Sequence, residues 1–416
     1  MAAGTSASNL DPALIFEIDV NSDAFKQRWM DHMTEWSTRP PFYAVWDETV
    51  MVMVGRHADA MEVFSDRERF SVELPARVGF ERFDKFYGVE VLTQKDGADH
   101  DRLRRLSAPA YGPAAMRKFD QEMSRILDEM LDVLPTDGSV FDIVELFGDH
   151  LMVRIMLDGM FRLDERQRAV FNQMRAVIPM ATTLPPGAEF PQVYVDAFTA
   201  TRATIHELIA ERRASPGDDI ISRLVHARED DDQFTDKELH DAIFTLCATA
   251  LQSTVSAMSG LLIALWKNPD QLAAVRSDRS LIPSAVEEGL RLHGPALFTF
   301  PRFALEDTSV GGTPIHKGMI VRVAPAAANL DPSVYPNPLT FDARRNPQKT
   351  LSFGWGSHIC IAQRLARMIL NRSLERILDR FPTLELADID FTPTYRGQAG
   401  ELVPASIIMR IPPARP

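Results

Sequence analysis

Apolar residues recur every three or four positions along most of the chain, a spacing that predicts amphipathic helices. The longest such run, 237–267, is apolar nearly all round its middle and ends before Asn268 and Pro269, so we expect a buried helix. Four polar residues interrupt its centre, and a core helix is therefore favoured over the competing interpretation as a membrane span. Further helices are predicted at 58–64, 116–134, 142–157, 165–177, 193–214 and 282–292, and another opens at 100–105.

Short apolar runs bounded by turn residues predict a smaller number of strands. Residues 42–46 and 50–54 are two such runs separated by three polar residues, which is typical of a β-hairpin. Other short strands are expected at 301–304, 308–310, 319–323 and 405–410.

The composition is that of a globular protein. Of 416 residues, 45% are hydrophobic and 25% are charged. The formal net charge of −13 argues against a general nucleic-acid-binding function. Two cysteines provide no disulfide framework and fit a reducing compartment, so a cytoplasmic location is expected. Residues 1–12 have neither the basic start nor the apolar core of a signal peptide.

One glycine-punctuated stretch, 352–362, carries the most specific chemistry in the chain. An amphipathic run begins at Cys360, so this cysteine is expected in the first turn of a helix, where free N–H groups and the helix dipole favour a thiolate. Gly354 and Gly356 let the backbone turn tightly and approach whatever the sulfur binds. A thiolate approached by a flat loop suits an axial ligand of haem iron.

Other roles are compatible with a single cysteine. A buried cysteine often serves only as a small hydrophobic side chain. A structural zinc site needs four suitable ligands, and two cysteines do not readily supply them. A nucleophilic cysteine is the stronger alternative, since a helix N-terminus activates thiols and His358 is two residues away from Cys360. Residues two apart do not face each other on a helix, however, so His358 is poorly placed as the base.

The whole pattern Phe-Gly-x-Gly-x-His-x-Cys-x-small resembles the haem-binding loop of the cytochrome P450 superfamily, and the chain is most similar to soluble bacterial members of the camphor-hydroxylating type. Ala362 stands where the family usually has glycine, which is a mild change to another small residue. The resemblance implies a mainly α cytochrome P450 fold with a minor β-sheet region, as one compact triangular domain over 1–416. Its β-rich portions are expected near 42–54, 301–323 and 391–410. The implied cofactor is haem b, with Cys360 as its metal ligand and with cofactor contacts from Phe353, Gly354, His358 and Ala362.

Further features in the family's order extend the resemblance over nearly the whole chain. His100 and Arg104, four apart on one helix face, match the pair that holds a haem propionate. Arg302 and His358 match other positions that hold the propionates. The run 237–267 matches the helix that crosses the distal face of the haem.

A charged pair upstream of the cysteine loop matches another family feature. Glu288 and Arg291 lie on one predicted helix, and Glu288 precedes Cys360 by 72 residues. The intervening segment 329–344 resembles the family's meander. By resemblance, Glu288, Arg291 and Arg344 are expected to form a buried charge network that fixes the haem-side fold.

The middle of the long helix departs from the family at the oxygen-activation site. The family usually carries an acid followed by Thr, whereas here Gln252 holds the acid position and Ser253 the alcohol position, or Thr254 if the register shifts by one. A neutral amide can only donate or accept hydrogen bonds, whereas a carboxylate relays protons. One hypothesis is that Gln252 fills a polar notch while protons arrive through ordered water. The other is that the site suits hydrogen peroxide better than dioxygen, with the amide orienting the peroxide.

The resemblance implies a haem-thiolate monooxygenase that inserts one oxygen atom into a small hydrophobic substrate. Hydroxylation or oxidative O-demethylation of a terpenoid or aromatic compound is expected. A haem-thiolate binding or sensor protein without turnover is the alternative, and a cysteine hydrolase is a distant third. By family position, the substrate pocket is expected to draw on Phe86, Tyr87, Val177, Thr245, Thr249, Leu297, Phe298, Thr299 and Val403, which are largely apolar.

The segment 343–373 carries a positive net charge, although the chain as a whole is acidic. It holds six basic residues and no acidic ones. Some of these cations are expected to serve internal carboxylates or propionates, and the rest to form a basic patch for an acidic ferredoxin. The expected partners are therefore ferredoxin and ferredoxin reductase, with dioxygen or hydrogen peroxide as oxidant and no membrane or nucleic-acid partner, and the protein is expected to be a monomer. The six basic residues are Arg344, Arg345, Lys349, Arg364, Arg367 and Arg372.

Overall fold

The structure is a computed structural model that describes residues 10, 15–20, 22–46, 49–73, 92–177, 189–398 and 400–413. Helices make up most of it, which confirms the mainly α fold class. The α-helices are α1 (Asp23–Gln27), α2 (Trp29–Thr38), α3 (His57–Ser65), α5 (Gly97–Ser107), α6 (Pro113–Asp132), α7 (Asp149–Val153), α8 (Glu165–Val177), α10 (Gln192–Ala214), α11 (Ile220–Val225), α12 (Asp236–Trp266), α13 (Pro269–Ser277), α14 (Ile282–Leu292), α15 (Pro325–Ala328) and α16 (Gln363–Arg380). Short 3₁₀ turns are η3 (Leu92–Gln94), η4 (Ala108–Tyr111), η7 (Arg279–Leu281) and η8 (Gly356–His358).

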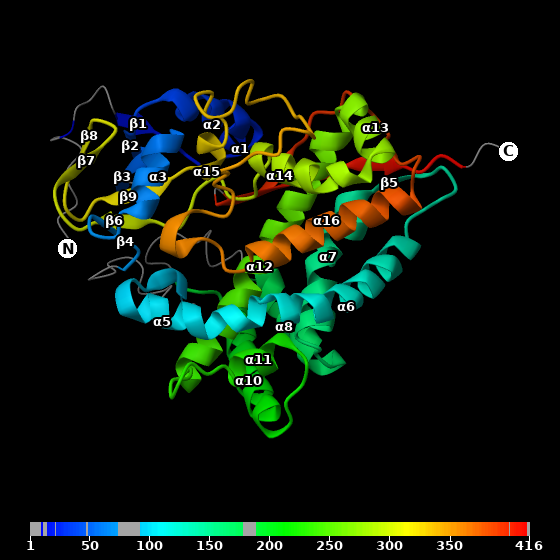
Figure 1. Ribbon diagram of the computed structural model, residues 1–416, viewed down its shortest axis with the longest axis horizontal. Helices are drawn as coiled ribbons and strands as arrows, with labels where there is room; N and C mark the ends of the chain where they lie inside the picture. Colours follow the sequence, from blue (N-terminus) through cyan, green and yellow to red (C-terminus); the bar gives the residue numbers. More distant parts are fainter. Residues whose placement is uncertain are drawn as a thin grey trace.

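The predicted long helix is α12, and it runs through the middle of the molecule (Figure 1). Its N-terminus is fixed by a capping box, in which the Glu238 amide donates to the Thr235 hydroxyl and the Thr235 amide donates to the Glu238 carboxylate. Among the described helices α12 alone is long and apolar enough to cross a membrane, yet 71% of its most apolar window is buried inside the fold. This burial matches the core helix that was favoured from the sequence.

The predicted helix at 142–157 is wrong as a single α-helix. Two π-helical segments, η5 (Val144–Gly148) and η6 (Arg154–Met160), flank the short helix α7. Each contains a glycine next to a neighbouring helix. A Cβ at Gly159 would lie a tight 3.0 Å from Ile126 of α6, and one at Gly148 would lie in ordinary contact, 3.4 Å from Val255 of α12. The hydrophobic spacing of the sequence does not encode such contacts or the wider turns.

The largest sheet has six strands in the order β1-β2-β3-β9-β6-β4. The hairpin expected from the sequence is its centre, where Phe42 pairs with Met53 in antiparallel register, and Met51 pairs in parallel with Ile320. The strands expected near 301–323 are also confirmed. The strands of this sheet are β1 (Ile15–Glu17), β2 (Phe42–Trp46), β3 (Thr49–Val54), β4 (Phe70–Ser71), β6 (Arg302–Ala304) and β9 (Ile320–Val323).

Three smaller sheets complete the β structure. The strand expected at 405–410 is only partly right, because within that range only 408–410 form a strand and 405–407 connect it to the strand that ends at Pro404. The Ala405 amide donates to the Thr394 carbonyl at 2.7 Å, which continues the pairing of the preceding hairpin by one residue. The strands are β5 (Val140–Asp142), β7 (Thr308–Val310), β8 (Thr313–Ile315), β10 (Glu385–Leu386), β11 (Tyr395–Gln398), β12 (Glu401–Pro404) and β13 (Ile408–Arg410).

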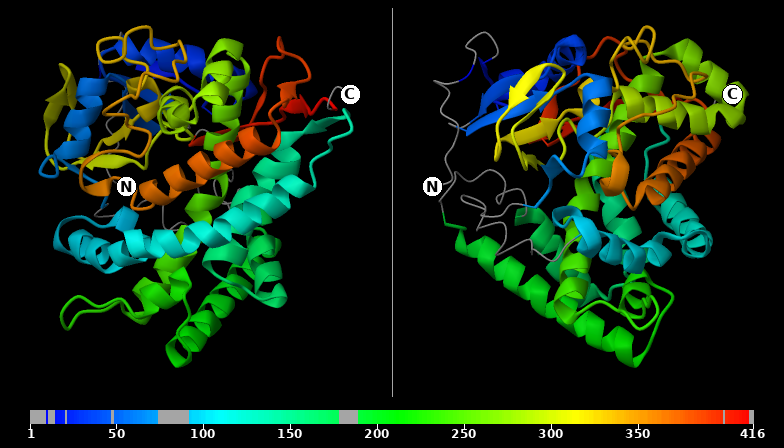
Figure 2. Two further views of the ribbon diagram at one scale, coloured as in Figure 1. Left: turned by 45° about the vertical axis from the view of Figure 1, so that its right-hand side comes forward. Right: turned by 60° about the vertical axis from the view of Figure 1, so that its left-hand side comes forward.

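The helices and the main sheet occupy different parts of the molecule. The six-stranded sheet lies with α3 at one end, where its apolar residues form their own core (Figure 1). Helices α6 and α16 pack side by side across the front of α12, and α10 lies on the far side of α12 from α16 (Figure 2). The loop that precedes α16 therefore lies between the sheet and the helical part.

Candidate active site

The loop that holds Cys360 folds back on itself. The Cys360 amide donates a hydrogen bond to the Phe353 carbonyl at 2.9 Å, and Gly354 and Gly356 both take a φ of +71°. A Cβ at Gly356 would lie 2.5 Å from the carbonyl oxygen of Phe64, so the close approach of this loop to α3 requires glycine.

Cys360 does not lie in the first turn of a helix, contrary to the expectation from the sequence. Helix α16 begins at Gln363, three residues later. Residues 361–362 form a turn instead, in which the Gln363 amide donates to the Cys360 carbonyl at 3.3 Å.

Three positive groups act on the Cys360 thiol. Burial raises its pKa, while a hydrogen bond from the Ala362 amide and the charges of Arg104 and Arg367 act in the opposite direction. A cation bound at the sulfur would lower the pKa of the thiol further and leave the thiolate as the stable form. Cys360 is therefore built as a ligand that ionises when a metal is present.

Two histidines and an unforeseen aspartate lie beside the loop. The ring centroids of His100 and His358 are 4.3 Å apart, and His358 Nε2 lies 2.8 Å from Asp96 Oδ1. Burial alone raises the pKa of Asp96, but hydrogen bonds from His358, Ser71 and the Val72 amide outweigh it and hold that pKa well below its usual range.

Two arginines extend this polar cluster. Arg104 Nη1 donates to the Ile359 carbonyl at 2.9 Å, and Arg302 is 5% exposed with its guanidinium 4.8 Å from the Phe64 ring centroid. Burial lowers the pKa of Arg302 to about 10, and the charge of Asp96 opposes that shift. The structure thus brings together four residues that the sequence pattern grouped: His100, Arg104, Arg302 and His358.

One face of α12 carries hydroxyl groups at every fourth position. Thr249 Oγ1 donates to the Thr245 carbonyl at 2.9 Å, and Ser253 Oγ donates to the Thr249 carbonyl at 3.1 Å. Thr249 is exposed and Thr245 and Ser253 are partly exposed, although most of α12 is buried. Tyr111 lies near both α12 and the loop, since burial and then the thiols of Cys360 and Cys247 raise the pKa of its hydroxyl.

The three candidate oxygen-activation residues have different surroundings. Ser253 is partly exposed on the hydroxyl-bearing face, whereas Thr254 is only 7% exposed and faces the core. The Gln252 amide donates to the Glu401 carbonyl at 3.2 Å, which ties α12 to the hairpin of β11 and β12. That contact matches the hypothesis in which Gln252 fills a polar notch.

A fully buried ion pair lies behind the loop. Arg291 binds Glu288 through two hydrogen bonds of 2.7 and 2.8 Å, and neither side chain is exposed. Arg345, not Arg344, adds the third charge, with its Nε 2.8 Å from Glu288 Oε1. Arg344 is exposed, so the expected network is wrong by one residue; the segment is irregular there, and no periodicity fixes which arginine faces inward.

The ion pair connects to the cysteine loop through Asn329, which sequence reasoning missed. Arg291 Nη1 donates to the Asn329 carbonyl at 2.9 Å, and the Asn329 side chain binds both the Leu351 amide at 2.7 Å and the Ser352 hydroxyl at 2.9 Å. These hydrogen bonds hold the start of the loop to α14, so the charge network positions Cys360 without touching it.

This combination of a cysteine loop, a buried Glu-Arg network and a central helix is matched by known proteins. The sequence model described as Cytochrome P450 matches residues 21–406. The chain belongs to the cytochrome P450 family.

Individual relatives agree with that assignment. The chain is 33% identical over 319 residues to 6-deoxyerythronolide B hydroxylase of Saccharopolyspora erythraea, a match that covers 76% of each protein. It is 33% identical over 343 residues to nocardicin C N-oxygenase of Nocardia uniformis, covering 80% of this chain and 83% of that protein. The solved structure of the ligand-free P450 monooxygenase TamI superposes with a TM-score of 0.84 at 28% identity, covering 96% of this chain and 94% of that one.

As a cytochrome P450, the protein is a monooxygenase that binds haem b through a cysteine thiolate. The residues of the site fit that cofactor. Arg104 and Arg302 are inward-lying cations without a carboxylate partner in the described part of the chain, and His100 Nε2 is buried with no partner there. These groups suit the carboxylates of the haem, as the sulfur of Cys360 suits its iron.

The P450 substrate-pocket residues expected from the sequence fall into two groups. Thr245, Thr249 and Thr299 retain exposed surface, whereas the four apolar ones are almost fully buried. The Phe298 ring, for example, packs 5.9 Å from that of Trp36. Phe86 and Tyr87 lie outside the described residues, and the four buried positions are Val177, Leu297, Phe298 and Val403.

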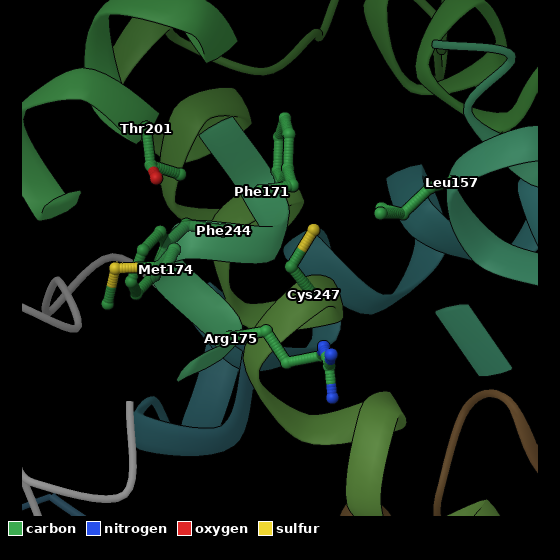
Figure 3. A pocket seen from close by; sticks show the side chains of 7 residues that line it. All are labelled: Leu157, Phe171, Met174, Arg175, Thr201, Phe244 and Cys247. Carbon is green, nitrogen blue, oxygen red and sulfur yellow. The ribbon is translucent and has the colours of Figure 1, made fainter. Parts of the chain in front are cut away.

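A small apolar cavity of about 10 Å³ lies elsewhere, between α8, α10 and α12 (Figure 3). Its lining includes Phe171, Met174, Phe244 and the second cysteine, Cys247. The volume is about that of one water molecule and the walls are apolar, so it is a packing defect of the P450 core. Burial raises the pKa of Cys247 well above its usual value, as is typical of an inert core cysteine.

Proposed function

We propose that this P450 oxygenates a small hydrophobic molecule, by hydroxylation or oxidative O-demethylation of a terpenoid or aromatic compound, and that it acts as a monomer in the cytoplasm. The hydroxyl-bearing face of α12 carries this proposal, because it is accessible at Thr249 and Ser253, holds a buried, unpartnered hydroxyl at Thr245 among the described residues, and is bordered by buried apolar side chains. Such a surface binds apolar compounds and orients them with a few hydrogen bonds. The names of the relatives, a hydroxylase and an N-oxygenase, support oxygen insertion as the reaction.

A library of small molecules, titrated against the ferric protein, tests the substrate class. Apolar terpenoids and aromatic ethers are expected to shift the haem spin state, whereas charged sugars and amino acids of similar size are not. Spin-state shifts confined to the polar compounds would contradict the proposal.

We further propose that electrons arrive from an acidic ferredoxin and its reductase through a basic surface on the cysteine side. Three of the six cations of 343–373 are exposed and hold no ion pair within the described part of the chain: Arg344, Lys349 and Arg364. The other three are engaged. Arg345 binds Glu288, Arg367 binds Glu287 and lies 4.4 Å from the Phe353 ring centroid, and Arg372 binds Asp120.

Neutralising the three exposed cations together, as Arg344→Gln, Lys349→Gln and Arg364→Gln, is expected to slow reduction by ferredoxin about tenfold at low salt, because complementary charge accelerates association. Stopped-flow reduction by ferredoxin measures this rate, and added salt should slow the parent more than the variant. Arg202→Gln on α10, an exposed cation on the other side of the protein, is the control and should leave the rate unchanged. Equal rates for parent and triple variant at every salt concentration would exclude this docking face.

Hydrogen peroxide is proposed as an additional oxidant because Gln252 replaces the acid of the family. The Gln252 amide nitrogen is held by the Glu401 carbonyl, which leaves Oε1 without a partner among the described residues. That oxygen can accept a hydrogen bond from a bound peroxide but cannot supply a proton.

Gln252→Asp is expected to raise NADPH-driven turnover relative to peroxide-driven turnover by about tenfold, since a carboxylate restores a proton relay. Gln252→Ala is the matched control, because it also removes the link to Glu401 but adds no acid. Both reactions are measured with the library compound that gives the largest spin-state shift. If peroxide supports no turnover in the parent and both variants leave NADPH coupling unchanged, Gln252 has no special role in oxygen activation.

A further inference from the structure

Glu401 occupies an unusual place for a carboxylate. It is the first residue of β12, directly after the hairpin turn, and pairs with Gln398 of β11. Its backbone is fixed on two sides: its carbonyl accepts the Gln252 amide of α12, and it forms an antiparallel bridge with Ala296. The next residue is fixed as well, since the Leu402 carbonyl accepts the Ser256 hydroxyl at 2.5 Å. The first two residues of β12 are therefore fixed against the central helix.

No hydrogen bond or ion pair from a described residue reaches the Glu401 carboxylate. Desolvation, with no contribution from a neighbouring charge, raises its pKa to about 7. Leu402 and Val403, which follow it, are 5% and 2% exposed, whereas Glu401 is only partly buried and retains accessible surface. Gln252 and Ser253, at the adjoining part of α12, also retain accessible surface. We read this shared exposure as one surface, bordered by α12 and β12.

Two cationic groups on adjoining segments do not serve Glu401. Arg396, on the paired strand, forms an ion pair with Asp149. His293 precedes the segment bridged to Glu401, and desolvation followed by the charge of Arg291 lowers its pKa to about 4, which leaves it neutral. An ionised carboxylate in a poorly solvated place without a counter-ion is unfavourable, so a ligand that supplies the cation gains the interaction that the protein leaves unmade.

We infer that Glu401 is a specificity-determining residue that pairs with a cationic nitrogen of the substrate, so that the preferred substrates are apolar molecules bearing a basic amine. This inference rests on the proposed function, because it places the apolar part of the substrate on the hydroxyl-bearing face of α12. Its backbone contacts with Gln252 and Ala296 fix Glu401 next to α12, which makes its carboxylate a suitable point of attachment. Neutral and anionic molecules of the same shape lack the pairing, and an anion also meets like charge.

The test compares two probes of equal shape, benzyltrimethylammonium and the neutral neopentylbenzene. The quaternary nitrogen has no lone pair and cannot bind the haem iron, so any effect of its charge reports on the protein. Dissociation constants are measured at pH 8.5 by spin-state titration and by calorimetry, for the haem-loaded parent, Glu401→Gln and Glu401→Asp. The preference is the ratio of the two constants in each protein.

The dissociation constant of the neutral probe divided by that of the cation measures the preference. This ratio is expected to be at least ten times higher in the parent than in Glu401→Gln, and to lie between these two values in Glu401→Asp. The neutral probe, which should bind all three proteins within about twofold, reports that the variants are folded. If neopentylbenzene binds the parent but the preference is the same in Glu401→Gln, the inference about Glu401 is wrong while the proposed apolar site stands. If neither probe binds the parent, the proposed substrate class fails and the inference fails with it.

Discussion

Replacing Cys360 by serine is expected to abolish completely the thiolate-type spectrum of the reduced, CO-bound protein. A bound metal deprotonates a thiol readily, whereas a serine hydroxyl is a poor ligand at neutral pH. The surrounding loop should survive, since its closure depends on the Cys360 backbone amide and on Gly356, not on the sulfur. The measurement is the absorbance difference between the reduced protein with and without CO.

The second cysteine provides the control. Cys247 is buried in the core beside a small apolar cavity, so Cys247→Ala should keep the spectrum and lose only a little stability. A Cys360→Ser protein that retained the thiolate-type spectrum would show that another residue ligates the iron.

Glu288→Gln is expected to lower the free energy of unfolding by about 3–5 kcal/mol, because it leaves Arg291 charged and fully buried without its carboxylate. A typical domain has a total stability of roughly 5–15 kcal/mol, so the haem-loaded variant should unfold at a much lower urea concentration. The loop that carries Cys360 should loosen as well, since Arg291 holds Asn329 and Asn329 holds Leu351. Urea unfolding followed by circular dichroism and by haem absorbance measures both effects.

Glu287→Gln, one residue earlier on the same helix, is the matched control. Glu287 pairs with Arg367 at a partly exposed site, where such a pair contributes about 1 kcal/mol or less. Equal urea midpoints for the two variants would contradict the stabilising role assigned to the buried pair.

Hydrophobic periodicity predicted the helices well where one face of a regular helix packs on the core. The helices expected at 165–177 and 282–292 have those bounds in the structure. The expectation failed at 142–157, where glycines approach neighbouring helices and π turns replace the regular ladder. Such turns depend on packing partners far away in the sequence, and local spacing does not contain that information.

The candidate site could be predicted where its residues form a linear motif. The Cys360 loop, the pair of His100 and Arg104, and the pair of Glu288 and Arg291 are of this kind. Residues on irregular segments outside such a motif were missed or misassigned, because nothing in the local sequence fixes which side chain faces inward. The examples are Arg345 in place of Arg344, together with Asp96 and Asn329.

The central claim is that this P450 inserts one oxygen atom into an apolar compound bound beside α12. The most direct test is mass spectrometry of the product formed under ¹⁸O₂ from the library compound with the largest spin-state shift, with NADPH, ferredoxin and its reductase. The predicted result is a product heavier than its substrate by one ¹⁸O atom, or, for an aryl methyl ether, loss of the methyl group as ¹⁸O-labelled formaldehyde. A protein that shows the thiolate-type CO spectrum and accepts electrons, yet yields no oxygenated product from any spin-shifting compound, would contradict the claim and identify a binding or sensor protein instead.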